Sequence, residues 1–94
     1  MVLELDYDVK ANAIRIKVDD KNYAYVKFHL EGKKIFLDST YTPEEHRGKG
    51  IGGELMKASM DYAEKNGLLI VPVCAFATEY FKRHPQYDRF LSKG

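Results

Sequence analysis

Alternating apolar and polar residues predict a β-hairpin early in the chain. Between Ala13 and Asp19 apolar side chains recur at every second position, which is the period of a strand with one buried face. Tyr23 to Leu30 repeats this period, and Asp20-Lys21-Asn22 is expected to form the turn between the two strands. The side chains expected to face the core are Ile14, Ile16, Val18, Ala24, Val26, Phe28 and Leu30.

A third strand is predicted directly after the hairpin. Lys34 to Thr42 follows the short link Glu31-Gly32-Lys33 and ends before Pro43. Three strands joined by short links favour an antiparallel meander. Leu3 to Tyr7 is expected to add a strand at the edge.

The period changes to that of a helix between Gly48 and Asn66. Apolar and small residues recur there at three- and four-residue spacing, and charged residues fill most other positions. Gly67 can adopt the left-handed conformation that often ends a helix, and Leu68 to Val73 is expected to follow as a strand buried on both faces. A strand, a helix and a strand in this order indicate a right-handed crossover with locally parallel strands.

The C-terminal segment is predicted to be helical. Ala75 to Arg83 is expected to form a second helix that His84-Pro85 ends, and Tyr87 to Leu91 a last short turn or helix. The order of elements predicts an α+β or α/β fold with a mixed sheet: an antiparallel meander, a helix after a glycine turn, a parallel strand and a C-terminal helix. We expect one domain over residues 1–94, because a chain of roughly 100 residues buries about 60 to 65% of its unfolded surface in one core.

Composition and charge exclude several classes of function. Hydrophobic residues make up 45% of the chain and charged residues 31%, as in ordinary globular proteins. The 15 basic and 14 acidic residues are interspersed, so we expect no nucleic-acid partner and no membrane partner. The longest apolar run is too short to span a bilayer, and the acidic N-terminus is unlike a signal peptide. These features and the single cysteine, Cys74, favour a cytoplasmic monomer, and the sequence predicts no metal site.

A glycine-rich turn between the third strand and the long helix is the most informative segment. Four of the six positions from Gly48 to Gly53 are glycine, which costs a helix start roughly 0.5–1 kcal/mol for each helical position relative to alanine. Glycine lets the backbone approach a ligand closely, and the unpaired amides of a first helical turn attract phosphate. Arg47 and Lys49 would add positive charge.

Two familiar phosphate-binding loops do not match this turn. A Walker A loop needs a lysine followed by serine or threonine, which the turn lacks, and its spacing also departs from the three-glycine dinucleotide motif. ATP and NAD are therefore poor candidates. A glycine-rich connector that binds no ligand stays open as the alternative on spacing alone.

The pattern Arg47-x-x-Gly50-x-Gly52, placed after a strand and before a long helix, resembles the acetyl-coenzyme A binding motif of the Gcn5-related N-acetyltransferase family. The second half of the chain adds to this resemblance. Val71-Pro72-Val73-Cys74-Ala75-Phe76 and Tyr80-Phe81-x-Arg83-His84-Pro85-x-Tyr87 are similar to segments of the minimal single-domain members. The resemblance covers most of the chain, from Tyr23 to Leu91.

The resemblance implies a mixed sheet whose central strands separate to admit the pantetheine arm of acetyl-coenzyme A. The pyrophosphate would bind the backbone amides of the glycine turn, and the helix that contains Tyr80 would flank the cofactor. The cofactor-binding residues implied in this way are Tyr41, Thr42, Arg47, Gly48, Lys49, Gly50, Ile51, Gly52, Gly53, Tyr80 and Arg83. The implied activity is acetyl transfer to a primary amine, on a small molecule or on a lysine side chain of a protein.

The chain departs from the small members of the family in two places. They often carry histidine before the threonine of the third strand, where this chain has Ser39, and serine-tyrosine after the cysteine, where it has Ala75-Phe76. A base or hydroxyl role is therefore not carried over to either place. The extra helices that form the acceptor site in full-length members are also expected to be absent, so the resemblance implies no acceptor class.

Cys74 is the leading candidate for a catalytic residue. It is predicted to lie where a strand meets the N-terminus of a helix, which favours a thiolate. It would protonate the leaving thiolate or accept the acetyl group itself, and the equal alternative is a small buried hydrophobic residue. His84 is expected to cap helix carbonyls, and Tyr80 and Tyr87 to pack against the core. His46 is expected to be exposed and without a role.

Other polar residues are weaker candidates. Carboxylates near the predicted cleft would attract a cationic amine or would simply be solvated: Asp38, Glu44 and Glu45. One strand face is typical of a surface that meets a partner: Tyr23, Tyr25, Lys27 and His29. The sequence thus favours an acetyltransferase. A module that binds or senses coenzyme A without efficient turnover is the alternative, and a protein that only mediates contacts is a third hypothesis.

Overall fold

The structure is a computed structural model that describes residues 7–93. It contains a five-stranded sheet with the order β1-β2-β3-β4-β5. The strands are β1 (Tyr7–Lys10), β2 (Ala13–Lys17), β3 (Tyr23–Glu31), β4 (Lys34–Tyr41) and β5 (Leu69–Pro72). Neighbours from β1 to β4 are antiparallel, and β5 runs parallel to β4. The predicted mixed sheet, with a meander followed by a parallel strand, is confirmed.

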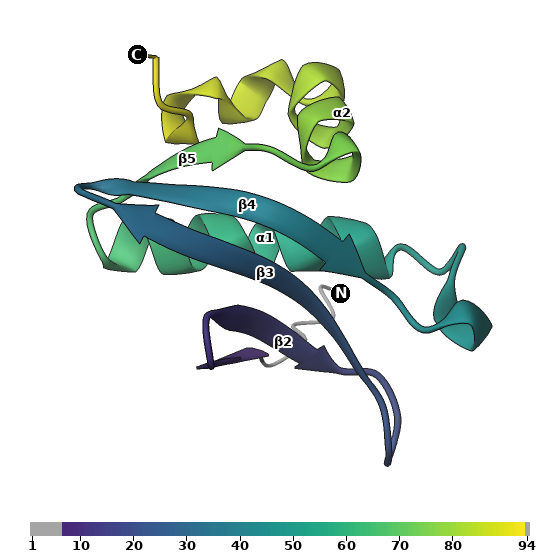
Figure 1. Cartoon of the computed structure of the whole chain (residues 1–94). Helices are drawn as coiled ribbons and strands as arrows, with labels where there is room; N and C mark the ends of the chain where they lie inside the picture. Colours follow the sequence, from purple (N-terminus) through teal and green to yellow (C-terminus); the bar gives the residue numbers. More distant parts are fainter. Residues whose placement is uncertain (1–6, 94) are drawn as a thin grey trace.

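The helices lie on one side of this sheet. A short 3-10 turn, η1 (Glu44–His46), and helix α1 (Ile51–Lys65) connect β4 to β5, and α2 (Ala75–Arg83) and η2 (Pro85–Phe90) follow β5. Figure 1 shows α1 crossing behind β3 and β4, with α2 beyond β5. Helix α1 packs against β2, β3, β4 and β5, and α2 packs against α1, β4 and β5. Among the described residues, the opposite face of β1, β2 and β3 therefore carries no helix.

The core lies between the sheet and α1. The hairpin contributes Ile14, Ile16, Ala24, Val26 and Phe28, all buried as the alternation predicts. Leu30 is 50% exposed, so its predicted burial is wrong. The reason is that β2 begins at Ala13, opposite Lys27, so β2 does not extend alongside the end of β3 that contains Leu30.

Two further predictions change at the edges of the sheet. Most of the predicted edge strand Leu3 to Tyr7 lies outside the described residues, and the described edge strand is β1. The apolar segment Leu68 to Val73 is not buried on both faces. Ile70 is buried, but Leu69 and Val73 are 43% and 53% exposed, because β5 is the last strand of the sheet.

The strands β4 and β5 separate toward their carboxyl ends. They pair from Lys34 to Leu37, where the amides of Val73 and Cys74 both donate to the Leu37 carbonyl at 3.1 Å. On the other side of β4, Lys27 pairs with Ser39 but Phe28 pairs with Leu37, so Asp38 is the extra residue of a β-bulge. A bulge bends its strand and increases the twist. The rest of β4 therefore leads away from β5, toward the glycine turn.

No helix in the range 7–93 is long and apolar enough to cross a membrane.

Candidate functional site

The glycine turn forms the N-terminus of α1. Gly48 and Gly50 have φ angles of 82° and 80°, in the left-handed region that strains other residues. Gly50 is the N-cap residue, and within the described chain no side chain caps the helix. The first hydrogen bond along the axis runs from the Glu54 amide to the Gly50 carbonyl. The amides of the first helical turn thus keep no partner within the helix, as is usual at this end.

A pocket of about 490 Å³ opens over this helix end. The end of β4, the following loop, the first turn of α1 and the start of α2 line it: Thr40, Tyr41, Thr42, His46, Arg47, Gly48, Gly50, Ile51, Gly52, Gly53 and Phe76. Unpaired amides and the positive end of the helix dipole attract anions. The pocket therefore suits an anionic group.

Most of the predicted cofactor-binding residues meet in this pocket, and three do not. Lys49, Tyr80 and Arg83 are not among its lining residues. Lys49 and Arg83 are exposed. The ring of Tyr80 lies beside the first turn of α1, because a β-carbon added to Gly53 would lie 3.8 Å from it.

Arg47 is held in the loop before α1. Its Nε donates to the Thr42 carbonyl oxygen at 3.0 Å, which ties the two ends of the loop together. A guanidinium carries five N–H groups, so this bond leaves the others for a ligand. Arg47 thus combines a loop contact with a positive charge at the pocket wall.

Phe76 also lines the pocket, and the sequence analysis did not identify it as a site residue. Its ring lies over Gly52, so that a β-carbon added there would be 2.4 Å from the ring carbon Cζ. The Phe76 side chain is 43% exposed and forms a wall of the pocket. The Phe76 ring therefore leaves no room for a side chain at position 52.

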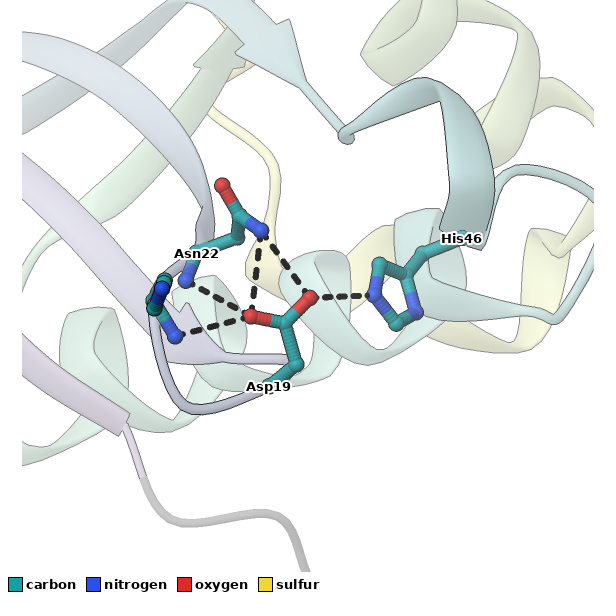
Figure 2. Close-up of polar contacts among 4 residues, drawn as sticks. Asp19, Asn22 and His46 are labelled. Carbon is teal, nitrogen blue, oxygen red and sulfur yellow. Dashed lines mark hydrogen bonds and ion pairs between the residues drawn. The ribbon is translucent and has the colours of Figure 1, made fainter.

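His46 links the glycine loop to the β2–β3 turn, so the expectation that it is exposed is wrong. Its side chain is 16% exposed, and its Nε2 lies 2.8 Å from Oδ2 of Asp19. Figure 2 shows His46 pointing from η1 toward Asp19. The Asp19 carboxylate also accepts bonds from the Lys21 amide and from the amide and side chain of Asn22. These bonds, with that of Asn22 the largest, hold the pKa of Asp19 well below its usual value.

The same cluster has donor atoms of the kind that metals bind. Ligand atoms of Asp19, Glu45 and His46 lie within 4.8 Å of one another. Both oxygens of Asp19 already accept hydrogen bonds, one of them with the ring of His46. His46 and Asp19 of this cluster thus already form a polar link between two loops.

Cys74 lies at the point where β4 and β5 separate. It is the N-cap residue of α2, and its Sγ accepts a hydrogen bond from the Ala77 amide at 3.4 Å. The Thr78 hydroxyl donates to the Cys74 carbonyl oxygen at 3.0 Å. The thiol is free and partly buried, and it does not line the pocket at the glycine turn. Its predicted position at a helix N-terminus is confirmed.

Asp38 is paired on the opposite face of the sheet. At the bulge of β4, its Oδ2 lies 2.6 Å from Nδ1 of His29, and Nε2 of that ring lies 3.0 Å from Glu31. The bonds to Asp38 first and to Glu31 next raise the pKa of His29. Asp38 is thus fixed where β4 leaves β5.

Three aromatic rings stack beside the first turns of α1. The ring of Tyr80 lies 4.1 Å from that of His84 and 6.3 Å from that of Tyr87. Nδ1 of His84 lies 2.7 Å from the Tyr80 carbonyl oxygen, which is the helix-capping contact expected from the sequence. Burial first, and then the charges of Tyr87 and Glu54, raise the pKa of Tyr80. Tyr80 therefore keeps its proton at neutral pH.

Comparison with known proteins places this arrangement among relatives. Residues 13–90 match the family model described as GCN5-related N-acetyl-transferase. Protein NATD1 of Danio rerio is 31% identical over 94 residues, which cover 95% of this chain and 86% of that protein. Protein NATD1 of Homo sapiens is 25% identical over 85 residues, 88% of this chain and 75% of that protein. The solution NMR structure of a GCN5-like protein from Staphylococcus aureus superposes with a TM-score of 0.75 at 26% identity, covering 97% of this chain and 91% of that chain.

Proposed function

The chain belongs to the GCN5-related N-acetyltransferase family, and from this premise we propose that it transfers the acetyl group of acetyl-coenzyme A to a primary amine. The observation that carries the proposal is the uncapped, glycine-built N-terminus of α1, which faces a pocket beside the end of β4, beyond its pairing with β5. The acceptor amine would belong to a small molecule or to a protein lysine. The proposed enzyme is a cytoplasmic monomer.

The residues of the pocket fit a pyrophosphate. The amides of Ile51, Gly52 and Gly53 are unpaired within the helix, so they can donate to phosphate oxygens. A β-carbon added to Gly48 or Gly50 would meet no atom within 4 Å, so the backbone at both glycines faces open space. Arg47 supplies the countercharge.

The pantetheine arm is proposed to lie along the unpaired part of β4. Beyond Leu37, β4 has no pairing with β5 among the described residues, so its backbone groups on that side are available to the amides of the arm. Tyr41 and Thr42 lie at the pocket end of this stretch. The arm would thus run from the glycine turn toward Leu37 and Cys74.

Acetyl-coenzyme A supplies an activated thioester when it is bound. The protein must then hold a neutral amine, stabilise charge on the carbonyl oxygen and return a proton to the leaving sulfur. We assign the proton donor to Cys74, which lies where the strands separate, with direct capture of the acetyl group on its sulfur as the variant mechanism. Asp38, fixed at the bulge, would attract the cationic amine, which releases one proton to solvent before its neutral form attacks the thioester.

A calorimetric titration with acetyl-coenzyme A, followed by an acetylation assay with a panel of amines, tests the proposal. We expect saturable binding and transfer of more than one acetyl group per protein molecule. AMP, which lacks the pyrophosphate and the pantetheine arm, is the control and should compete weakly.

The outcomes separate the hypotheses from the sequence. Binding without multiple turnover would favour a module that binds or senses coenzyme A. Absence of binding would reject both and leave the glycine turn a connector.

A further inference from the structure

The sheet face opposite the helices arranges its outward side chains in rows across the strands. Lys10 pairs with Ala13, and Ala13 pairs with Lys27, so these three side chains form one row. Paired residues share a face and neighbouring strands are about 4.8 Å apart, so the two lysines stand roughly 10 Å apart with the small Ala13 between them. A hollow flanked by two cations results.

This hollow belongs to a groove of about 570 Å³ on the open face. The β1–β2 turn, β2, the β2–β3 turn and β3 line it: Lys10, Ala11, Ala13, Arg15, Lys21, Asn22, Tyr23, Tyr25 and Lys27. The lining contains four basic residues and no carboxylate. Asp8 neutralises Arg15 through two bonds of 2.8 and 2.7 Å. In the described chain, no carboxylate forms an ion pair with Lys10, Lys21 or Lys27.

The groove adjoins the end of β4 that also lines the cofactor pocket. In the row next to Lys27 on β4 lies Ser39, directly after the bulged Asp38. The ring of Tyr25 in the groove lies 5.2 Å from that of Tyr41, which also lines the cofactor pocket. An anionic molecule that also carries an amine could therefore bind in the groove and place this amine close to Asp38 and to the diverging ends of β4 and β5.

The aromatic residues favour a polypeptide over single-stranded nucleic acid as the occupant. Nucleic-acid platforms stack bases on free aromatic faces. Here the Arg15 guanidinium lies 4.2 Å from the centre of the Tyr23 ring, and Tyr25 packs against Tyr41 with Lys27 above it at 6.0 Å. The carboxylates Asp8 and Asp38 on the same face would also repel a continuous phosphate backbone, whereas separate lysines suit spaced carboxylates.

We propose that this open-face groove is the docking site for an acidic polypeptide segment, and that the acceptor amine is a lysine within or beside that segment. The docking claim stands on the groove alone. The identification of the docked segment as the acceptor rests on the proposed acetyltransferase function.

Fluorescence anisotropy with a labelled peptide of aspartates, glutamates and one lysine tests the docking. A peptide of equal length with asparagine and glutamine at the acidic positions, and an oligothymidylate, are the comparison probes. We expect the acidic peptide to bind more tightly than both. The double variant Lys10→Gln/Lys27→Gln should weaken it about five- to tenfold, because two exposed ion pairs are lost. Lys57→Gln/Lys82→Gln, which removes two exposed lysines from the helices, is the matched control and should have no effect.

Each other outcome overturns the proposal. Equal binding of the acidic and neutral peptides, tighter binding of the oligothymidylate, or equal loss in the control variant would reject docking of an acidic segment. In a second experiment acetyl-coenzyme A is added to the protein and the peptide, and mass spectrometry measures acetylation of the peptide lysine. If the protein binds acetyl-coenzyme A but shows no preference for the acidic peptide, docking in the groove is rejected and the proposed function is not. If the acidic peptide docks but acetyl-coenzyme A does not bind, the proposed function is rejected and docking is not.

Discussion

The two helix N-termini near the candidate site are built in opposite ways. Helix α1 begins at Gly50, which has a φ of 80° and no capping side chain. Helix α2 begins at Cys74, whose Sγ accepts a hydrogen bond from the Ala77 amide. The Thr78 hydroxyl donates a hydrogen bond to the Cys74 carbonyl oxygen. The first helix end presents its amides to a pocket, and the second pairs its Ala77 amide with its own N-cap side chain.

The difference shows where an external anion can bind. Glycine at the N-cap loses only about a few tenths of a kcal/mol relative to a capping side chain, and each glycine at a helical position adds roughly 0.5–1 kcal/mol to the cost. That cost is offset only if another partner accepts the amide hydrogens. At α1 the partner would be the cofactor, whereas at α2 the partner is Cys74 itself.

Replacing Gly50 with alanine should have the largest effect. A left-handed φ costs a residue with a β-carbon about 1–2 kcal/mol, and the displaced amides would lose charge-assisted hydrogen bonds. We expect acetyl-coenzyme A affinity to fall about thirtyfold by calorimetry. Gly67→Ala is the matched control, because Gly67 has a φ of 65° at the other end of α1. It should lose similar thermal stability with unchanged affinity, and an equal loss of affinity in both would reject the pocket at α1.

Removal of a positive charge beside the glycine turn should have the next largest effect on acetyl-coenzyme A affinity. Arg47 lines the pocket and Lys49 does not, although both were expected to add positive charge to the glycine turn. Arg47→Gln should weaken acetyl-coenzyme A about tenfold, since it removes a charge-assisted phosphate contact, and Lys49→Gln about twofold at most. The measurement is the same titration at two salt concentrations. Equal effects of the two substitutions would mean that only the general positive charge of the loop matters.

The link between His46 and Asp19 should have a smaller, indirect effect. Asp19→Asn weakens the contact that holds the glycine loop, so we expect acetyl-coenzyme A affinity to fall about threefold, while Glu45→Gln leaves it unchanged. The pKa of Asp19 is lowered in the folded protein, so its contribution to stability is present above the ordinary value of 3.8 and is lost as the pH falls through the lower folded value. Thermal unfolding should therefore separate wild type from Asp19→Asn at neutral pH, and the difference should shrink in acid. A constant difference would contradict this account.

Local patterns explain which parts of the fold the sequence predicts. The period of two in β2 and β3 and the period near four in α1 follow from one buried face in each element, so both were visible in the residues. The exposure of Leu30 and of parts of the segment Leu68 to Val73 was not visible in the residues, because it depends on how far the neighbouring strands extend. Periodicity does not contain that information.

The candidate site divides in the same way. The glycine turn is contiguous in sequence, and its residues do line one pocket. The contact between His46 and Asp19 joins residues 27 positions apart through two loops, and Phe76 meets Gly52 only because α2 packs against α1. No periodic pattern in the sequence predicts either contact. Two acidic or polar turn residues, Asp19 and Asn22, were the only signal near the first of these contacts.

Substitution of Cys74 should have the smallest effect on acetyl-coenzyme A affinity. It also tests most directly what the N-terminus of α2 does. Cys74→Ser keeps a capping acceptor, and serine is a preferred N-cap residue, whereas Cys74→Ala removes the cap and should cost about 0.5–1 kcal/mol of stability. Both variants should bind acetyl-coenzyme A within about twofold of wild type, because the thiol lies outside the pocket at α1. If Cys74 only caps the helix, turnover should follow stability, and the serine variant should be as active as wild type. If its thiol moves a proton or captures the acetyl group, both variants should lose turnover alike, and intact-mass measurement should show acetylated wild type alone in the case of capture.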